Sequence, residues 1–282
     1  MKHAIKWSLA ALIISCSFNA LAEKIVYWDD VESFERLVSS ENKTDFARLS
    51  VYYQPQENKM FCGVASAAMV LNALRVDRTP EQIPLDSSQF STLESGYLPN
   101  GGGNVEHSDK SYVSWSPLFH RYTQNTVLIH SPKSRIEILG KPTKGSQFND
   151  YGLQLSQFVD LVKSNGAKVI SYELQNIDDI DTIKANMVTA LSQPEHYLVV
   201  NYARKGVEQK GGGHYAPVAA YDGDSDSFLI LDPNNADYLW HWVDATSMIK
   251  AMNTIDVDRY RGYAITVSYT HLTLPTKCWV YV

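Results

Sequence analysis

One interior cysteine stands where a thiol could act as a nucleophile. Of the three cysteines, Cys16 lies in an apolar N-terminal segment and Cys278 in an atypical C-terminal segment, which leaves Cys62. Cys62 follows a loop-like stretch and opens an Ala-rich helical pattern over residues 62–74. A helix N-terminus stabilises a thiolate, and Gly63 would leave room for a substrate to approach the backbone. Such a thiol is either an inert core residue or a nucleophile.

A thiol nucleophile needs a base, and the base needs an acceptor that orients it. His214 follows three glycines and begins an apolar run typical of a strand, and Asp232 ends the next such run. The polar stretch 222–227 between the runs predicts an antiparallel hairpin, whose outer ends lie side by side. We therefore expect His214 and Asp232 to be neighbours and to serve Cys62 as base and orienter.

A glutamine completes the candidate set. Gln56 lies six residues before Cys62, where papain-like cysteine enzymes place the glutamine that donates to the oxyanion. Together with the Cys62 backbone N–H it would stabilise a tetrahedral intermediate. The order Cys, His, Asp along the chain is also that of papain-like enzymes. Each residue alone is most often structural, but the order and spacing of the set favour a catalytic role.

The elements expected around these residues define an α+β fold, with helices mainly in the first half and a mostly antiparallel sheet after them. The nucleophile helix should pack on that sheet. A stretch rich in Ser, Gly and Asn, residues 86–110, is expected to form a loop. The spacing of apolar residues predicts further helices over 153–164 and 179–192, and strands over 167–174, 196–203, 214–221 and 228–231.

Composition excludes several classes of protein. The 282 residues are 44% hydrophobic with a formal net charge of -6, values that do not fit a disordered chain and leave no surplus basic charge for nucleic acid. Three cysteines exclude a disulfide-stapled mini-protein. We expect one catalytic domain over residues 23–267.

Both ends of the sequence differ from that domain. Residues 1–22 have a basic start, an apolar run and an A-x-A cleavage pattern, which predict a secretory signal peptide and a periplasmic protein. A lipoprotein signal lipidated at Cys16 fits less well. Residues 268–282 resemble a translated sequencing adapter and are interpreted as a non-native read-through tail, against a genuine C-terminal strand. After signal removal, we expect no membrane segment.

Several segments resemble the phytochelatin synthase family. QPQENKMFCGVASAAMVLNALRVD is similar to its nucleophile segment, GGGHYAPVAAYDGDSDSFLILDPNNADYLWHWV to its His–Asp segment, and GLQLSQFVDLVKSNGAKV to the intervening helix. The resemblance implies a papain-like cysteine protease fold that acts on glutathione, γ-Glu-Cys-Gly. The cysteine would attack the Cys–Gly carbonyl and form a γ-Glu-Cys acyl-enzyme. That acyl group would pass to water, or to another glutathione to make metal-chelating phytochelatins.

The resemblance gives the triad and Gln56 the roles stated above and adds two arginines. By position, Arg204 and Arg261 would bind substrate, and bidentate guanidinium groups suit the two carboxylates of glutathione. No cofactor and no metal site of the protein are implied for acylation. Cadmium or zinc would arrive as glutathione thiolate complexes. The expected partners are glutathione or γ-Glu-Cys peptides, and a second copy in a homodimer.

The sequence also departs from the family. We expect no counterpart of the Cys-rich C-terminal domain of the plant members, and short prokaryotic members tend toward hydrolysis. We therefore favour hydrolysis of glutathione over phytochelatin synthesis and cadmium detoxification. Ala216 and Pro233 replace residues common in the family. Two alternatives stay open: a related papain-like peptidase of the double-glycine type, and a non-enzymatic exported protein that binds thiols or soft metals through Cys62.

Overall fold

The computed structural model describes residues 25–75, 82–97, 118–142 and 150–267. The predicted signal peptide at 1–22 and the predicted read-through tail at 268–282 lie outside the described residues. Within those ranges, no helix has both the length and the apolar character that crossing a membrane requires.

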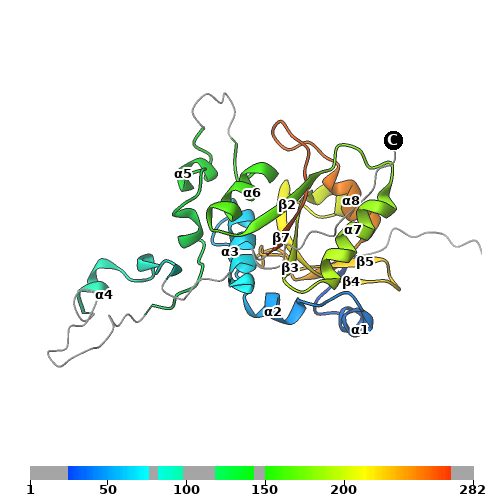
Figure 1. The fold of residues 1–282 in the computed structure, drawn as a ribbon, viewed down its shortest axis with the longest axis horizontal. Coiled ribbons are helices and arrows are strands. Elements are labelled where there is room, and N and C mark those ends of the chain that lie inside the picture. Colours follow the sequence, from blue (N-terminus) through cyan, green and yellow to red (C-terminus); the bar gives the residue numbers. More distant parts are fainter. Residues whose placement is uncertain (1–24, 76–81, 98–117, 143–149, 268–282) are drawn as a thin grey trace, which may run out of the picture.

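A seven-stranded antiparallel sheet lies at the centre of the described part of the chain (Figure 1). Its order is β1-β6-β5-β4-β3-β7-β2, so that β4 and β3 lie in the middle. The strands are β1 (Val26–Tyr27), β2 (Lys168–Glu173), β3 (His196–Ala203), β4 (Gly213–Asp222), β5 (Ser227–Ile230), β6 (His241–Asp244) and β7 (Gly262–Val267).

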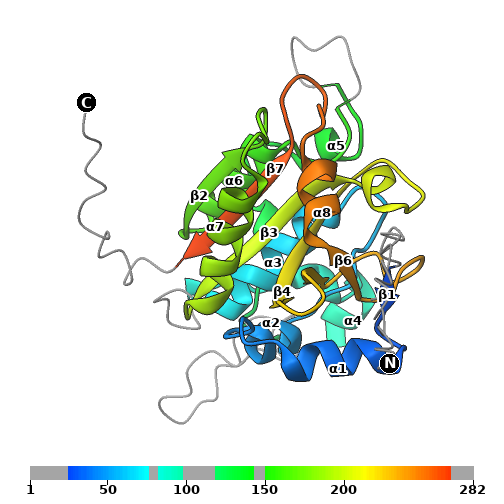
Figure 2. The ribbon, with the colours of Figure 1, turned by 90° about the vertical axis from the view of Figure 1, so that its right-hand side faces the viewer.

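Helices cover both faces of the sheet. In Figure 1, α3 and α6 lie on one side and α7 and α8 on the other, and Figure 2 shows α7 and α8 in front of the strands. The α-helices are α1 (Val31–Ser39), α2 (Phe46–Val51), α3 (Cys62–Leu74), α4 (Thr92–Tyr97), α5 (Arg135–Ile138), α6 (Leu155–Ser164), α7 (Ile180–Ser192) and α8 (Ala245–Met252). The 3-10 helices are η2 (Ser87–Gln89), η4 (Thr126–Leu128) and η5 (Arg204–Val207).

The strand pattern explains the two layers of core. Side chains alternate between the faces of a strand, so Val199 of β3 packs in the core that contains α3 and α6. Its neighbours Leu198 and Val200 pack in the core that contains α7 and α8. A central strand covered on both sides needs a continuous apolar run, which β3 has from residue 197 to 200.

The α+β class predicted from the sequence is confirmed, and α3 and β3 have the predicted bounds. Two details differ. The sequence did not predict β1, which precedes α1 in the chain and pairs with β6, because two residues are too few to show the alternation of a strand. Residues 92–97, expected in a loop, form α4, because Ser91 and Glu94 make the reciprocal hydrogen bonds of a capping box.

Candidate active site

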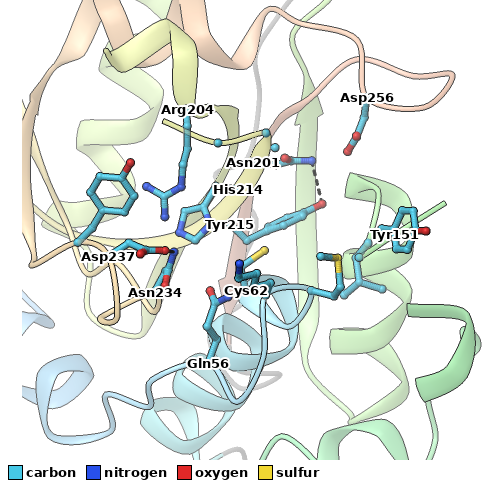
Figure 3. Close-up of a pocket in the computed structure, with 18 of the residues that line it drawn as sticks. Gln56, Cys62, Tyr151, Asn201, Arg204, His214, Tyr215, Asn234, Asp237 and Asp256 are labelled. Carbon is cyan, nitrogen blue, oxygen red and sulfur yellow. Dashed lines mark hydrogen bonds between the residues drawn. The ribbon is translucent and has the colours of Figure 1, made fainter. Parts of the chain in front are cut away.

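Helix α3 places Cys62 in the lining of a cavity. All the residues of α3 are buried, because small and apolar side chains allow it to pack closely against β4 of the sheet and against α6. Cys62 is its first residue and remains 8% exposed. The sulfur therefore sits at the helix N-terminus with one side open to the cavity (Figure 3).

Gly63 has a role in packing, and the approach of a substrate to its backbone stays a prediction. A Cβ at this position would lie 3.1 Å from Leu153 Cδ1 and 3.3 Å from Tyr215 Cδ2. These side chains fill the space beside Gly63. The glycine thus lets the first turn of α3 approach the start of β4, which carries His214.

The hairpin of β4 and β5 brings His214 and Asp232 together, as its pattern predicted. The His214 Nε2 atom lies 2.8 Å from Asp232 Oδ1. With Nε2 bound to the carboxylate, the other ring nitrogen is left for the hydrogen bond with Cys62. His214 is 4% exposed and Asp232 is fully buried. The three side chains thus have the arrangement that a nucleophile, its base and an orienting carboxylate require.

The electrostatics favour a thiolate and an imidazolium. Burial raises the pKa of the Cys62 thiol, but His214 and the backbone N–H groups of Tyr215 and Gly63 outweigh it, so the pKa lies below the ordinary value. Burial lowers the pKa of His214, but the negative Asp232 and Cys62 outweigh it, so that pKa is raised. Shifts in these opposite directions stabilise the charged pair that makes a cysteine nucleophilic.

Asp232 is held from several sides. Its Oδ2 atom lies 2.9 Å from Arg204 Nη2, and the Asn234 backbone N–H donates to Oδ1 at 2.8 Å. The Tyr53 hydroxyl donates to its backbone carbonyl. Burial raises the pKa of Asp232, but His214 and Arg204 hold it well below the usual range. Asp232 is therefore a fixed carboxylate, as a residue that orients a histidine must be.

Gln56 lies beside the thiol, below it in Figure 3. Its backbone N–H donates to the Pro233 carbonyl at 2.8 Å, and its Nε2 donates to the Asn58 carbonyl at 2.8 Å. An amide nitrogen has two N–H groups, so one remains for a ligand. Within the described residues, the buried Gln56 Oε1 has no hydrogen-bond partner. The side chain lines the same cavity as Cys62 and His214.

The cavity has a volume of about 680 Å³ and carries charges of both signs. Lys59 and Lys210 contribute cations, and Asp237 and Asp256 contribute carboxylates. Such a cavity suits a small zwitterion better than an apolar ligand. Among the described residues, no group of three or more His, Cys, Asp or Glu side chains is arranged to hold a metal ion.

The structure pairs both arginines proposed for substrate binding with carboxylates of the chain. Arg204 lines the cavity, but it is 3% exposed and bound to Asp232. Arg261 binds Asp256 at 2.7 Å and does not line the cavity itself. The Arg204–Asp232 pair was not foreseen from the sequence, because it joins η5 to the segment after β5. The Asx turn at Asp232–Asn234 does have a sequence signal, Asp-Pro-Asn.

Comparison with known proteins identifies the family. A family model described as phytochelatin synthase matches residues 18–93 and 108–263. The chain is 26% identical over 222 residues to glutathione gamma-glutamylcysteinyltransferase 3 of Lotus japonicus, and the aligned part is 78% of this chain and 37% of that protein. It is also 26% identical over 222 residues to glutathione gamma-glutamylcysteinyltransferase 2 of Arabidopsis thaliana, and here the aligned part is 78% of this chain and 39% of the relative.

A fungal relative gives the same result. The chain is 22% identical over 234 residues to the glutathione gamma-glutamylcysteinyltransferase of Schizosaccharomyces pombe, with 82% of this chain and 45% of the relative covered. The chain thus spans less than half the length of each of these relatives. It belongs to the phytochelatin synthase family, whose curated members are named as transferases.

Proposed function

We propose that this chain is a papain-like cysteine enzyme that cleaves the Cys–Gly bond of glutathione. The observation that carries the proposal is the buried series Cys62, His214 and Asp232 at a cavity with charges of both signs. Glutathione has one ammonium and two carboxylate groups, which complement such a cavity. The names of the relatives point to the same substrate.

In the first half of the reaction, the Cys62 thiolate attacks the carbonyl carbon of the Cys–Gly peptide bond. The negative charge that develops on the carbonyl oxygen is stabilised by the Cys62 backbone N–H and by Gln56 Nε2. The imidazolium of His214 gives its proton to the glycine nitrogen, the C–N bond breaks, and glycine leaves. The product is a γ-Glu-Cys thioester on Cys62.

In the second half, neutral His214 takes a proton from the acceptor that attacks the thioester. With water as the acceptor, γ-Glu-Cys is released and the thiol is regenerated. With the γ-Glu amine of a second glutathione as the acceptor, a new peptide bond forms and a phytochelatin results. We favour water, as in the short prokaryotic members that the sequence resembles.

The polar ends of the cavity would align the substrate. Asp256 lines it from the segment before β7, and its pKa is raised by burial although Arg261 opposes the shift. A partly buried carboxylate is suited to bind the γ-Glu ammonium group. Lys59 and Lys210 would attract the carboxylates of the substrate. On this proposal Arg261 acts by holding Asp256, while Arg204 holds the orienter.

Product analysis tests the proposal. Incubation with glutathione, with and without cadmium, should release glycine, and the accompanying product separates the two reactions: γ-Glu-Cys for hydrolysis and γ-Glu-Cys oligomers for synthesis. Cleavage of a double-glycine leader peptide without glycine release would contradict the proposal in favour of a peptidase. Cadmium or zinc binding without any turnover would support the non-enzymatic alternative.

The predicted signal peptide sets the compartment of this reaction. If residues 1–22 direct export, the substrate is extracytoplasmic glutathione or a related thiol peptide. Fractionation of cells expressing the full chain should place the mature protein in the periplasm, with cleavage after residue 22. Retention of the uncleaved chain in the cytoplasm would contradict this part of the proposal.

A further inference from the structure

Two buried side chains extend the hydrogen-bonded series behind Arg204. The Arg204 Nη1 donates to Gln209 Oε1 at 2.5 Å, and Gln209 Nε2 lies 3.0 Å from His241 Nε2. On the far side of the ring, His241 Nδ1 lies 2.8 Å from the Leu239 carbonyl. Gln209 is 5% exposed and His241 is fully buried, so water competes little for these bonds.

Only one arrangement of protons satisfies this series. A guanidinium group has no acceptor, so the oxygen of Gln209 faces Arg204 and its amide nitrogen faces His241. The His241 Nε2 atom must then accept, and its Nδ1–H donates to the Leu239 carbonyl. Burial lowers the pKa of His241 to about 4, which keeps the ring neutral as this arrangement requires.

The guanidinium group of Arg204 is enclosed by neighbouring residues on several sides. Gln209 is tied to Arg204 a second time, because its backbone N–H donates to the Arg204 carbonyl at 3.0 Å. The centroid of the Tyr238 ring lies 4.2 Å from the guanidinium carbon. Gly211, with a φ of +124°, approaches so closely that a Cβ there would lie 3.0 Å from Arg204 Cδ. Gln209 and His241 thus define how the guanidinium faces Asp232.

We propose that Gln209 and His241 are positioning residues that hold Arg204 on Asp232 and, through Asp232, hold His214 against Cys62. Without the Gln209 oxygen, a buried N–H group of Arg204 loses its partner, and the guanidinium turns to find another. The carboxylate then binds His214 less firmly. The effect of these residues on glutathione turnover rests on the proposed function, but their effect on the thiol does not.

The reactivity of Cys62 reports this positioning. The charged and titratable groups that act on His214 are Cys62, Asp232 with Arg204 behind it, the edge of Tyr202 and, through space, His241. Since Arg204 stays charged when Gln209 or His241 is replaced, the main change is a weaker bond between the carboxylate and His214. A less stabilised imidazolium raises the pKa of the Cys62 thiol.

The test is the rate of Cys62 alkylation by iodoacetamide as a function of pH, in Gln209→Leu, His241→Leu and His241→Gln. The leucine variants should slow alkylation at neutral pH about tenfold, within the range expected for an unpaired buried donor, and move the rise of the profile to higher pH. His241→Gln keeps an acceptor near the position of Nε2 and should stay close to the wild-type profile.

The control is His120→Leu. The His120 ring also bonds a backbone carbonyl, that of Ile83, but it lies beside the C-terminal end of α3. Profiles of the two leucine variants at Gln209 and His241 that match this control would overturn the proposal. So would a His241→Gln profile shifted as far as that of His241→Leu. Thermal unfolding of each variant verifies that a folded protein was measured.

A second measurement needs no variant, in case the leucine variants do not fold. Nitrogen-15 NMR of the wild-type histidines at pH 7 should show His241 as the neutral tautomer with the proton on Nδ1. A charged ring, or a proton on Nε2, would contradict the series. If the alkylation profiles of the leucine variants shift but the wild type does not turn over glutathione, the positioning role stands and the proposed substrate is wrong. If the wild type turns over glutathione but the profiles do not shift, the proposed substrate stands and the positioning role is wrong.

Discussion

Gln56 and Pro233 are joined by a backbone hydrogen bond of 2.8 Å, from the N–H of Gln56 to the carbonyl of Pro233. A second bond of 2.8 Å runs from the Tyr53 hydroxyl to the carbonyl of Asp232. The loop before α3 is therefore fastened to the segment that follows β5. These two bonds hold Gln56, the candidate oxyanion donor, in a fixed position relative to Asp232, the candidate orienting carboxylate, although the two residues are distant in sequence.

The first prediction concerns Gln56. Replacement by glutamate keeps the shape but removes the N–H donor, so kcat for glutathione cleavage should fall about 100-fold to 1,000-fold. KM should change little, because the donor acts mainly in the transition state. Gln54→Glu is the matched control, since Gln54 lies in the same loop and bonds the Tyr122 carbonyl outside the cavity. Equal losses in the two variants would contradict the oxyanion role.

The second prediction separates two roles of Arg204. Lysine keeps the charge but cannot reach Asp232 and Gln209 at once, as the planar fork does. If Arg204 holds the orienter, steady-state kinetics of Arg204→Lys should show a lower kcat with little change in KM. A higher KM with an unchanged kcat would instead indicate a direct grip on the substrate. Arg48→Lys, at an exposed ion pair with Glu195, serves as the control.

The third prediction concerns the pH profile of the thiol. The pKa of Cys62 is lowered and that of His214 is raised, so a thiolate–imidazolium pair should persist over a range of pH that extends below the ordinary cysteine pKa. Alkylation should therefore be fast at neutral pH and fall only under acidic conditions. In His214→Ala the rate should rise with pH like that of a free thiol, with a midpoint near 8.5. A wild-type profile of that kind would refute the ion pair.

The fourth prediction concerns acid stability. The folded chain keeps the pKa of His241 near 4 by burial, whereas the unfolded chain has the ordinary value of 6.5. As the pH falls below 6.5, the unfolded state binds the proton first. The stability that His241 contributes is thus full above pH 6.5 and is lost as the pH falls toward 4, by up to about 3 kcal/mol.

Urea unfolding at pH 7 and pH 4.5 checks this sign. The free energy of unfolding of the wild type should drop more between the two values than that of His241→Gln, which has no proton to bind there. Other groups, such as Asp232, titrate in both proteins and cancel in the comparison. Equal drops would show that His241 is already charged in the folded chain, or that it is not buried.

The hairpin explains how much of the site could be predicted from sequence. The placement of His214 beside Asp232 follows from two apolar runs and one polar turn, so local patterns were sufficient. The helix that starts at Cys62 could also be predicted, because residues 62–74 are rich in alanine and other small or apolar residues and contain no proline. The same local patterns gave the bounds of β3.

The support behind the triad could not be predicted in this way. Gln209 lies in the loop between η5 and β4 and His241 at the start of β6, and no sequence pattern connects them with Arg204. Their partnership arises because β6 and the segment after β3 meet only in the folded chain. Gly63 shows the same limit, since its close neighbours Leu153 and Tyr215 are distant in sequence.

The most direct test of the account is the mass of the protein during turnover of glutathione. Acid quenching should trap an adduct of about 232 Da, the mass of γ-Glu-Cys less water, on the peptide that contains Cys62. In Cys62→Ala the adduct and the release of glycine should both be absent. Glycine release from Cys62→Ala at the wild-type rate would contradict the account, as would an adduct at another residue.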